Sequence, residues 1–225
     1  NPIPWIQCAL ERGPTVGRTH ALLGEVLLGR GLLDQGLMEL RLAASYEPGL
    51  SDLTATIAAS STQDPAKLLA TVPEGRWGSL VLDALGERLR GRGASESAEV
   101  IDREAVARDP RRLGPRRRLA DARLDSLDTA TPLCADRAGC IAEVQTQAQA
   151  MTEIAPSDTV GSRTRARLLA AQGDAAAAID LLREGCKAPT GRDQCLMLRA
   201  QLLLRNPTPE LDAALEEFVA ASCAA

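Results

Sequence analysis

Aromatic residues are scarce in this chain of 225 residues, which contains two tryptophans, one tyrosine and one phenylalanine. The core of a β-sheet usually draws on aromatic and β-branched side chains. Alanine, leucine and arginine dominate here instead, and all three are strong helix formers. We therefore expect an all-helical protein with thin helix-on-helix packing.

Positive net charge and long apolar runs are also absent. The formal net charge is −4 at pH 7, whereas a general nucleic-acid binder needs a cationic face that displaces phosphate counterions. We therefore expect no nucleic-acid partner. No run of 18 apolar residues occurs, so this segment is not expected to insert into a membrane. The sequence begins at Asn1 without a methionine, which fits a mature or excised fragment.

The sequence lacks a catalytic constellation. Its one histidine, His20, has no second histidine with which to share a metal ion, and we expect it to pack at a helix interface. Ser60 and Ser61 are not within a Gly-x-Ser-x-Gly turn. The stretch GRGASES at 91–97 connects two expected helices and does not follow a strand, so it does not fit a phosphate-binding loop. We predict no enzyme activity, no cofactor and no metal site.

One ten-residue phrase occurs twice. LLGEVLLGRG at 22–31 agrees with ALGERLRGRG at 84–93 in seven of ten positions, and extending both copies gives 32-residue segments, 17–48 and 79–110, that end in proline. Leu23 and Leu27 are one helical turn apart and share a face, and Gly24 beside them allows a neighbouring helix to approach closely. We expect Gly31 to end the first helix and Pro48 to end the second.

The residues at these spacings resemble the tetratricopeptide repeat, a helix-turn-helix unit of 34 residues. The resemblance implies an all-α, right-handed α-solenoid of about five to six stacked units, some degenerate, in a single domain over 1–225. An irregular helical bundle is the alternative. The units are expected at 17–48, 51–78, 79–110, 113–156, 159–190 and 192–223, preceded by the end of a partial repeat at 1–14.

Two of these units depart from the pattern. The unit at 51–78 is short, with Asp64 and Pro65 at its turn, and the unit at 113–156 carries a loop insertion before Ile141. Arginine also replaces the usual apolar residue at positions 116, 123 and 165.

The six cysteines include two local pairs. We expect disulfides between Cys134 and Cys140 and between Cys186 and Cys195. Free thiols and a metal site are the alternatives, although neither spacing is usual for zinc and no histidine lies nearby. The pairing of Cys8 and Cys223 is left open, and a bridge between Cys223 and Cys195 is an alternative to the one between Cys186 and Cys195. Disulfides would place the protein in the periplasm or outside the cell, whereas free thiols would return it to the cytoplasm.

In the repeat family that the chain resembles, the first helices of successive units line a concave groove that accepts a peptide. The resemblance assigns to this groove Arg18, Glu25, Asp83, Glu87, Arg90, Arg117, Asp121, Arg163 and Arg167. The predicted groove changes from acidic near Asp83 to basic near Arg163, which suits a peptide with the opposite order of charges. A solvated helix face would also carry mixed charges.

The function expected from this resemblance is that of a non-catalytic scaffold, in the cell envelope, that binds a protein or peptide. Two alternatives remain. In the first alternative, the segment is the soluble tail of a larger membrane-bound cell-envelope polymerase or ligase. In the second, it is a structural subunit of an envelope complex. Reversing the charges of Arg163 and Arg167 is expected to weaken a groove ligand by about tenfold, or about 1.4 kcal/mol.

Overall fold

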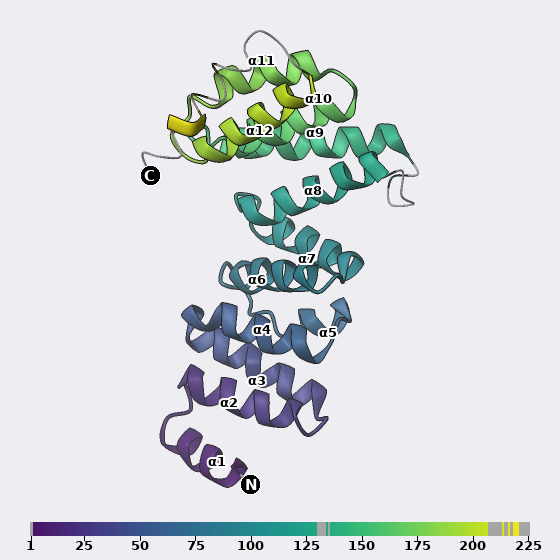
Figure 1. Cartoon of the computed structure of the whole chain (residues 1–225). Helices are drawn as coiled ribbons and strands as arrows, with labels where there is room; N and C mark the ends of the chain where they lie inside the picture. The colour runs from purple at the N-terminus through teal and green to yellow at the C-terminus, as the bar shows by residue number, and fades with distance from the viewer. Residues whose placement is uncertain are drawn as a thin grey trace. The chain divides into compact units, whose positions relative to one another are not determined.

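The computed structural model describes residues 2–129, 134, 136–206, 213, 216 and 218–220, and Figure 1 shows their helices. The chain divides into two compact units, Asn1–Pro115 (unit 1) and Arg116–Ala225 (unit 2). The described residues form helices and no strand, so the expected all-α class is confirmed. The predicted single domain over 1–225 stays a prediction.

Unit 1 is built from helical hairpins. The predicted segments 17–48 and 79–110 each contain two helices joined by a short turn (Figure 1). The helices of unit 1 are α1 (Ile3–Arg12), α2 (Gly17–Leu28), α3 (Leu33–Tyr46), η1 (Pro48–Leu50), α4 (Ser51–Ser61), α5 (Pro65–Leu69), α6 (Gly78–Gly91) and α7 (Ser95–Arg108). The main core packs α3 to α7 through Leu37, Leu40, Ala44, Ala55, Ala58, Ala59, Leu68, Val72, Val81, Leu82, Leu85, Leu89, Ala98, Ile101 and Ala105.

The turns between the helices of three hairpins close in the same way. In each, a glycine in the left-handed region follows the first helix, and the amide after that glycine donates to a carbonyl five residues back. This is the Schellman closure, for which glycine is suited because it has no Cβ. The three glycines are Gly31, Gly93 and Gly173, with φ of 77°, 76° and 91°. The three bonds, each 3.0 Å long, are Leu32 to Leu27, Ala94 to Leu89 and Asp174 to Leu169.

Glycine also sets the distance between α2 and α3. A Cβ added at Gly36 would lie 2.5 Å from Leu28 Cγ, and one added at Gly24 would lie 3.0 Å from the carbonyl oxygen of Gly36. The close approach predicted at Gly24 is therefore confirmed, and Gly36 supplies the other half of the contact. Leu40 and Ala43, on the same stripe as Gly36, are fully buried.

The short unit at 51–78 contains one full helix and one single turn of helix. The Asp64 side chain caps α5 by accepting from the Ala66 amide at 2.9 Å, and Pro65 occupies the first helical position. Since α5 ends at Leu69, an irregular segment leads from it to α6. The repeat that the sequence predicts to be degenerate therefore has a shortened second helix.

Unit 2 contains the two longest helices of the described residues, α8 (Leu113–Thr129) with 17 residues and α9 (Arg137–Ile154) with 18. Helix α8 begins just before the boundary, and the other helices of unit 2 are α10 (Val160–Ala171), α11 (Ala175–Gly185) and α12 (Arg192–Arg205). Helix α9 begins four residues before Ile141, where the second helix of that unit was expected to resume. Residues 130–133 and 135 of the predicted insertion and most of the last unit after α12, Cys223 included, lie outside the described residues.

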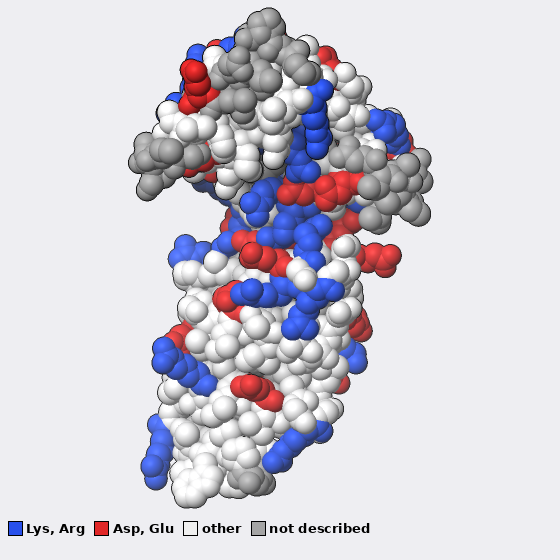
Figure 2. Space-filling view, viewed as in Figure 1, with Lys and Arg blue, Asp and Glu red and all other residues white. Residues whose placement is uncertain are grey.

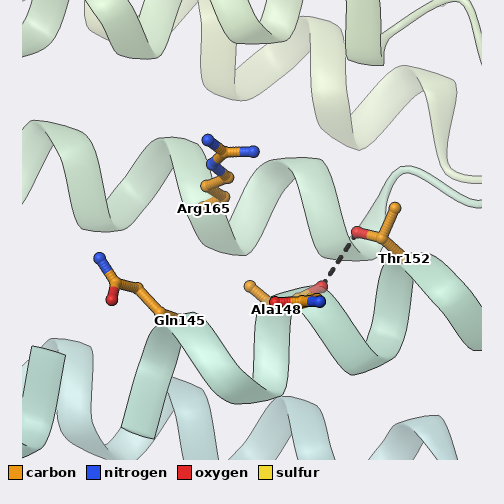
Figure 3. A pocket seen from close by; sticks show the side chains of 5 residues that line it. Gln145, Ala148, Thr152 and Arg165 are labelled. Carbon is orange, nitrogen blue, oxygen red and sulfur yellow. Dashed lines mark hydrogen bonds between the residues drawn. The ribbon is translucent and has the colours of Figure 1, made fainter. Parts of the chain in front are cut away.

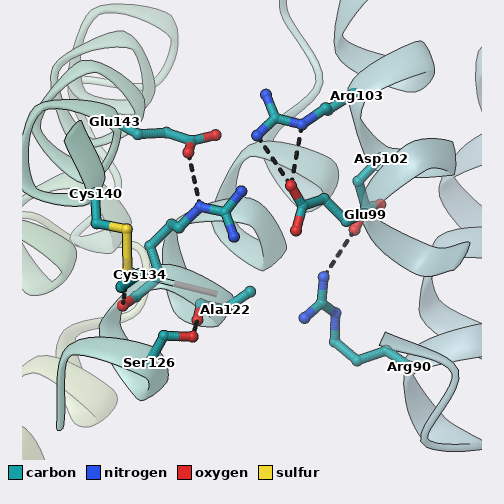
Figure 4. A network of polar contacts seen from close by, with 10 residues as sticks. Arg90, Glu99, Asp102, Arg103, Ala122, Ser126, Cys134, Cys140 and Glu143 are labelled. Carbon is teal, nitrogen blue, oxygen red and sulfur yellow. Dashed lines mark hydrogen bonds and ion pairs between the residues drawn. A yellow bond between two sulfur atoms is a disulfide. The ribbon is translucent and has the colours of Figure 1, made fainter. Parts of the chain in front are cut away.

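The contact between α8 and α9 is partly polar. Arg116 donates to Gln147 Oε1 at 2.7 Å, and Arg123 donates from Nε to Glu143 Oε2 at 2.8 Å (Figure 4 shows Glu143). Burial lowers the pKa of the Arg116 guanidinium. Two arginines in apolar positions of the repeat are thus accommodated because α9 supplies a matching amide and carboxylate.

Candidate functional site

A cavity of about 280 Å³ in unit 2 lies along three helices, each the first helix of its predicted repeat. Helix α8 contributes two residues to it, one turn apart, whereas α10 and α12 each contribute a stripe spaced i, i+3, i+4 and i+7. Such a stripe is one face of a helix. We call this cavity the unit-2 groove, and it is lined by Arg117, Asp121, Val160, Arg163, Thr164, Arg167, Gln194, Met197, Leu198 and Gln201.

The groove contains three guanidinium groups with different partners. Arg167 binds Asp121 through Nη1 and Asp125 through Nη2, the latter at 3.3 Å. Arg163 donates to the neutral side-chain oxygen of Gln194. Arg117 makes no hydrogen bond or ion pair within the part of the chain that the structure describes. Asp121 and Asp125 are thus engaged by Arg167, whereas Arg117 and Arg163 make no ion pair with a carboxylate among the described residues.

Arg163 is the most desolvated of these cations. Its Nε atom is buried and has no hydrogen-bond partner. Burial lowers the pKa of the Arg163 guanidinium, Arg117 and Arg167 lower this pKa further, and Asp158 and Asp121 oppose the shift. A cation held away from water beside two like charges is stabilised by an incoming anion.

The remaining predicted groove residues lie in unit 1, and most of them are already paired. Asp83 accepts from Arg112 Nη1 at 2.9 Å, and Arg90 Nη2 lies 3.2 Å from Asp102 Oδ2 (Figure 4). The other three, Arg18, Glu25 and Glu87, are exposed, and Arg18 lies 3.6 Å from Glu47. The acidic-to-basic order proposed along the groove runs through both units and stays a prediction.

Sequence reasoning missed the contribution of α12 to the groove. The segment from Arg192 was assigned to a repeat, but Gln194, Met197, Leu198 and Gln201 were not named as groove residues. Their spacing of i, i+3, i+4 and i+7 was visible in the sequence. Assigning groove positions to the first helix of this unit, as for the other units, identifies these residues, because equivalent positions of successive repeats share a face.

The two local cysteine pairs form disulfides in the structure. Cys134 and Cys140 have Cα atoms 5.9 Å apart (Figure 4), and Cys186 and Cys195 have Cα atoms 5.4 Å apart. The second bridge is buried in the core of unit 2 and joins the end of α11 to α12. Cys8, in unit 1, is a free and partly buried thiol.

His20 packs at the interface of α2 and α3, as predicted. Its Nδ1 lies 2.6 Å from Glu39 Oε2, its Nε2 lies 2.8 Å from the Pro14 carbonyl oxygen, and its ring centroid is 5.3 Å from that of Tyr46. Both ring nitrogens are therefore engaged within the protein. Among the residues searched, 2–129, 134, 136–206 and a few beyond, no group of three or more histidine, cysteine, aspartate or glutamate residues could hold a metal ion.

The surface carries charges of both signs. Figure 2 shows arginine and lysine side chains interspersed with aspartate and glutamate on the visible face of each unit. A single-sign field of the kind that attracts a polyanion is not present on that face. No helix among the described residues is long and apolar enough to cross a membrane.

No protein-family model matches the chain, and no curated protein sequence is significantly similar to it. Among solved structures, the chain resembles a monomeric mutant of IFIT1 solved with Gppp-AAAA. The match has 15% sequence identity and a TM-score of 0.57, and it covers 96% of this chain and 53% of that one. The chain thus spans about half the length of IFIT1.

The likeness to IFIT1 concerns the fold alone, because the sequence identity is low. It supports an all-helical repeat fold of the tetratricopeptide-like kind, and the fold class expected from the sequence is confirmed. Membership of the tetratricopeptide family stays a prediction.

Proposed function

We propose that the protein is a non-catalytic scaffold that binds an acidic segment of a protein or peptide in the unit-2 groove. The observation that carries the proposal is the excess of positive charge along the groove, where Arg117 and Arg163 make no ion pair with a carboxylate in the described structure. Charge complementarity of this kind orients a ligand and speeds its encounter with the protein.

A peptide fits the other groove residues better than a nucleotide does. Met197, Leu198 and Val160 offer apolar contacts, and Gln194 and Gln201 offer amides for peptide groups. The lining includes no aromatic side chain on which a base could stack, and stacking is a major contribution to binding single-stranded nucleic acid. IFIT1 was solved with Gppp-AAAA, so this ligand belongs among the probes.

The two disulfides support a location in an oxidising compartment, such as the periplasm or the cell exterior, since disulfides persist there and are rare in the cytosol. A thiol count tests this location. Protein isolated from its native host is alkylated before and after reduction, and its intact mass is measured. Two or fewer free thiols are expected. Six free thiols would indicate a cytoplasmic location instead.

A peptide library displayed on phage tests the groove. Selection on the full chain should enrich aspartate and glutamate, and a selected peptide should bind more weakly to Arg117→Glu by about tenfold, or about 1.4 kcal/mol. Arg163→Glu should have a similar or larger effect. These substitutions are sharper than reversal of Arg167, because Arg167 holds Asp121 and Asp125 and its loss would disturb the groove itself.

Arg183→Glu is the matched control, since Arg183 lies on α11, outside the groove, and is exposed. The Arg183→Glu variant should bind the selected peptide with the same affinity as the unmodified chain. Peptides without acidic enrichment, or equal losses in all three variants, would refute the proposal. Preferential binding of Gppp-AAAA with the same dependence on Arg117 would assign the groove to a nucleotide instead.

A further inference from the structure

A second cavity in unit 2, of about 360 Å³, lies between α9 and α10. Four residues of α9 and one of α10 line it: Gln145, Ala148, Gln149, Thr152 and Arg165. Figure 3 shows the α9 side chains along one helix and Arg165 on the neighbouring one. Arg165 follows Arg163 by two residues, which is about 200° around a helix. The cavity therefore opens on a different side of α10 from the unit-2 groove.

The sequence explains why a cavity exists at this place. At Gly161 the two helices are in close contact, because an added Cβ would lie 2.2 Å from Thr152 Oγ1 and 2.9 Å from the Ala148 carbonyl oxygen. Arg165 lies one turn further along α10, on the same face as Gly161. An apolar residue is usual at that position of the repeat and would pack against α9. Arginine occupies this position instead, and Arg165 and Ala148 both line the cavity.

The polar groups of the cavity are largely unused by the protein. Arg165 and Gln145 have no hydrogen-bond or ion-pair partner within the described residues. Gln149 donates to Glu153 Oε1 at 2.9 Å, which leaves its own carbonyl oxygen as an acceptor. Thr152 donates to the Ala148 carbonyl oxygen at 3.0 Å (Figure 3). The lining thus offers one cation and several amide and hydroxyl groups, and it includes no carboxylate.

The charge and spacing of these groups define the ligand. A single guanidinium matches a carboxylate, which it can bind through two parallel hydrogen bonds, whereas a phosphate dianion would leave one charge without a partner. Gln145 and Gln149 are one turn apart, or about 6 Å along α9. An extended chain repeats every two residues, or about 6.6 Å. The two amides can therefore bind alternate peptide groups of one extended segment.

We propose that this cavity is a second peptide site, in which an acidic side chain of an extended segment binds Arg165 while its backbone binds Gln145 and Gln149. The site is separate from the unit-2 groove and does not depend on the function proposed for it. It also accounts for the arginine at 165, which the repeat pattern leaves unexplained.

The test uses two peptides that differ by one group, acetyl-Ala-Glu-Ala-amide and its neutral counterpart acetyl-Ala-Gln-Ala-amide. The full ¹⁵N-labelled chain is titrated with each, and the side-chain amide signals of Gln145 and Gln149 are followed by NMR. We expect saturable shifts with the acidic peptide, with a Kd in the millimolar range or below. Arg165→Gln should weaken this binding by about tenfold, and the neutral peptide should give the smaller shifts.

Two control variants separate this site from its surroundings. Arg163→Gln removes a cation of the unit-2 groove, and Arg183→Gln removes an exposed cation of α11. Neither should change the shifts at Gln145 and Gln149. Arg165 is exposed, so Arg165→Gln should keep the circular dichroism of the unmodified chain.

Three results would overturn the second site. They are equal shifts with both peptides, unchanged affinity in Arg165→Gln, and the absence of saturable shifts at Gln145 and Gln149. If the acidic peptide shifts only Gln194 and Gln201, the carboxylate binds in the unit-2 groove, and the second site is wrong while the groove proposal stands.

Discussion

Units 1 and 2 have the same kind of helical hairpin but different interiors. The main core of unit 1 consists of leucine, alanine, valine and isoleucine. Polar side chains are also buried in both units: unit 1 buries His20 and Asp102, whereas unit 2 buries three arginines, Arg118, Arg123 and Arg199. Unit 2 also contains both disulfides of the described residues. Buried charge adds little to stability unless it is paired and hydrogen-bonded. The difference indicates that unit 2 combines its apolar core with buried guanidinium groups and covalent links, whereas unit 1 buries no arginine among its described residues.

The chain offers a simple way to observe the units separately. Trp5, Tyr46 and Trp77 all lie in unit 1, and unit 2 contains neither tryptophan nor tyrosine. Tryptophan fluorescence therefore reports on unit 1, while circular dichroism reports on the helices of both. A change confined to unit 2 should move the second signal and not the first.

The largest effect is expected from Leu85→Ala in the core of unit 1. Leu85 on α6 is fully buried, and removing such a side chain costs about 2–5 kcal/mol through lost burial and an unfilled cavity. Urea unfolding followed by tryptophan fluorescence should show this loss. Leu22→Ala, on the exposed face of α2, is the matched control and should change stability by less than about 0.5 kcal/mol. Equal effects of both variants would contradict an apolar core as the source of stability.

An intermediate effect is expected from Cys186→Ala combined with Cys195→Ala. The bridge closes a loop with a sequence separation of nine residues, and the loss of such a link costs about 2–3 kcal/mol in the chain-entropy model. The unfolding transition followed by circular dichroism should shift to a lower denaturant concentration, while the midpoint of the transition of unit 1, followed by fluorescence, should not change. Cys8→Ala should leave the transition of unit 2 unchanged. A parallel loss in both signals would show that the units unfold as one.

The smallest effect is expected from Asp52→Asn on the surface of unit 1. Asp52 accepts from Arg88 at 2.6 Å, but the Asp52 side chain is well exposed and that of Arg88 is partly exposed. Exposed ion pairs contribute about 0–1 kcal/mol, so the free energy of unfolding should fall by less than about 1 kcal/mol. The difference should shrink in about 1 M salt, where surface charges are screened. A larger loss of unfolding free energy that does not depend on salt would show that this ion pair contributes more to the stability of unit 1 than an exposed pair should.

Much of the fold could be predicted because the repeat places constrained residues at fixed positions. Gly24 and Gly31 are required by close helix contact and by a left-handed turn, and Pro48 follows the end of α3. Each requirement is local or depends on the adjacent helix. The sequence therefore predicts the hairpins of unit 1, and it also indicates the degenerate segment near Pro65.

The charged site was harder to predict, because the partner of a surface charge depends on neighbouring helices. Sequence spacing placed Arg117, Asp121, Arg163 and Arg167 on groove-facing positions, and the structure gathers them around one cavity. Spacing could not show that Arg112 pairs with Asp83, nor that Arg167 pairs with both Asp121 and Asp125. Which charges remain for a ligand is a property of side-chain geometry, and the sequence pattern does not contain it.

The buried disulfide between Cys186 and Cys195 also bears on proteolysis. Lys187, just beyond Cys186, is well exposed, and a trypsin-like protease that cut after it would open the backbone between α11 and α12. The two fragments would stay joined through the sulfur atoms, with α10 on one fragment and α12 on the other. A nicked chain would keep the two helices that form most of the groove, and it would separate only after reduction.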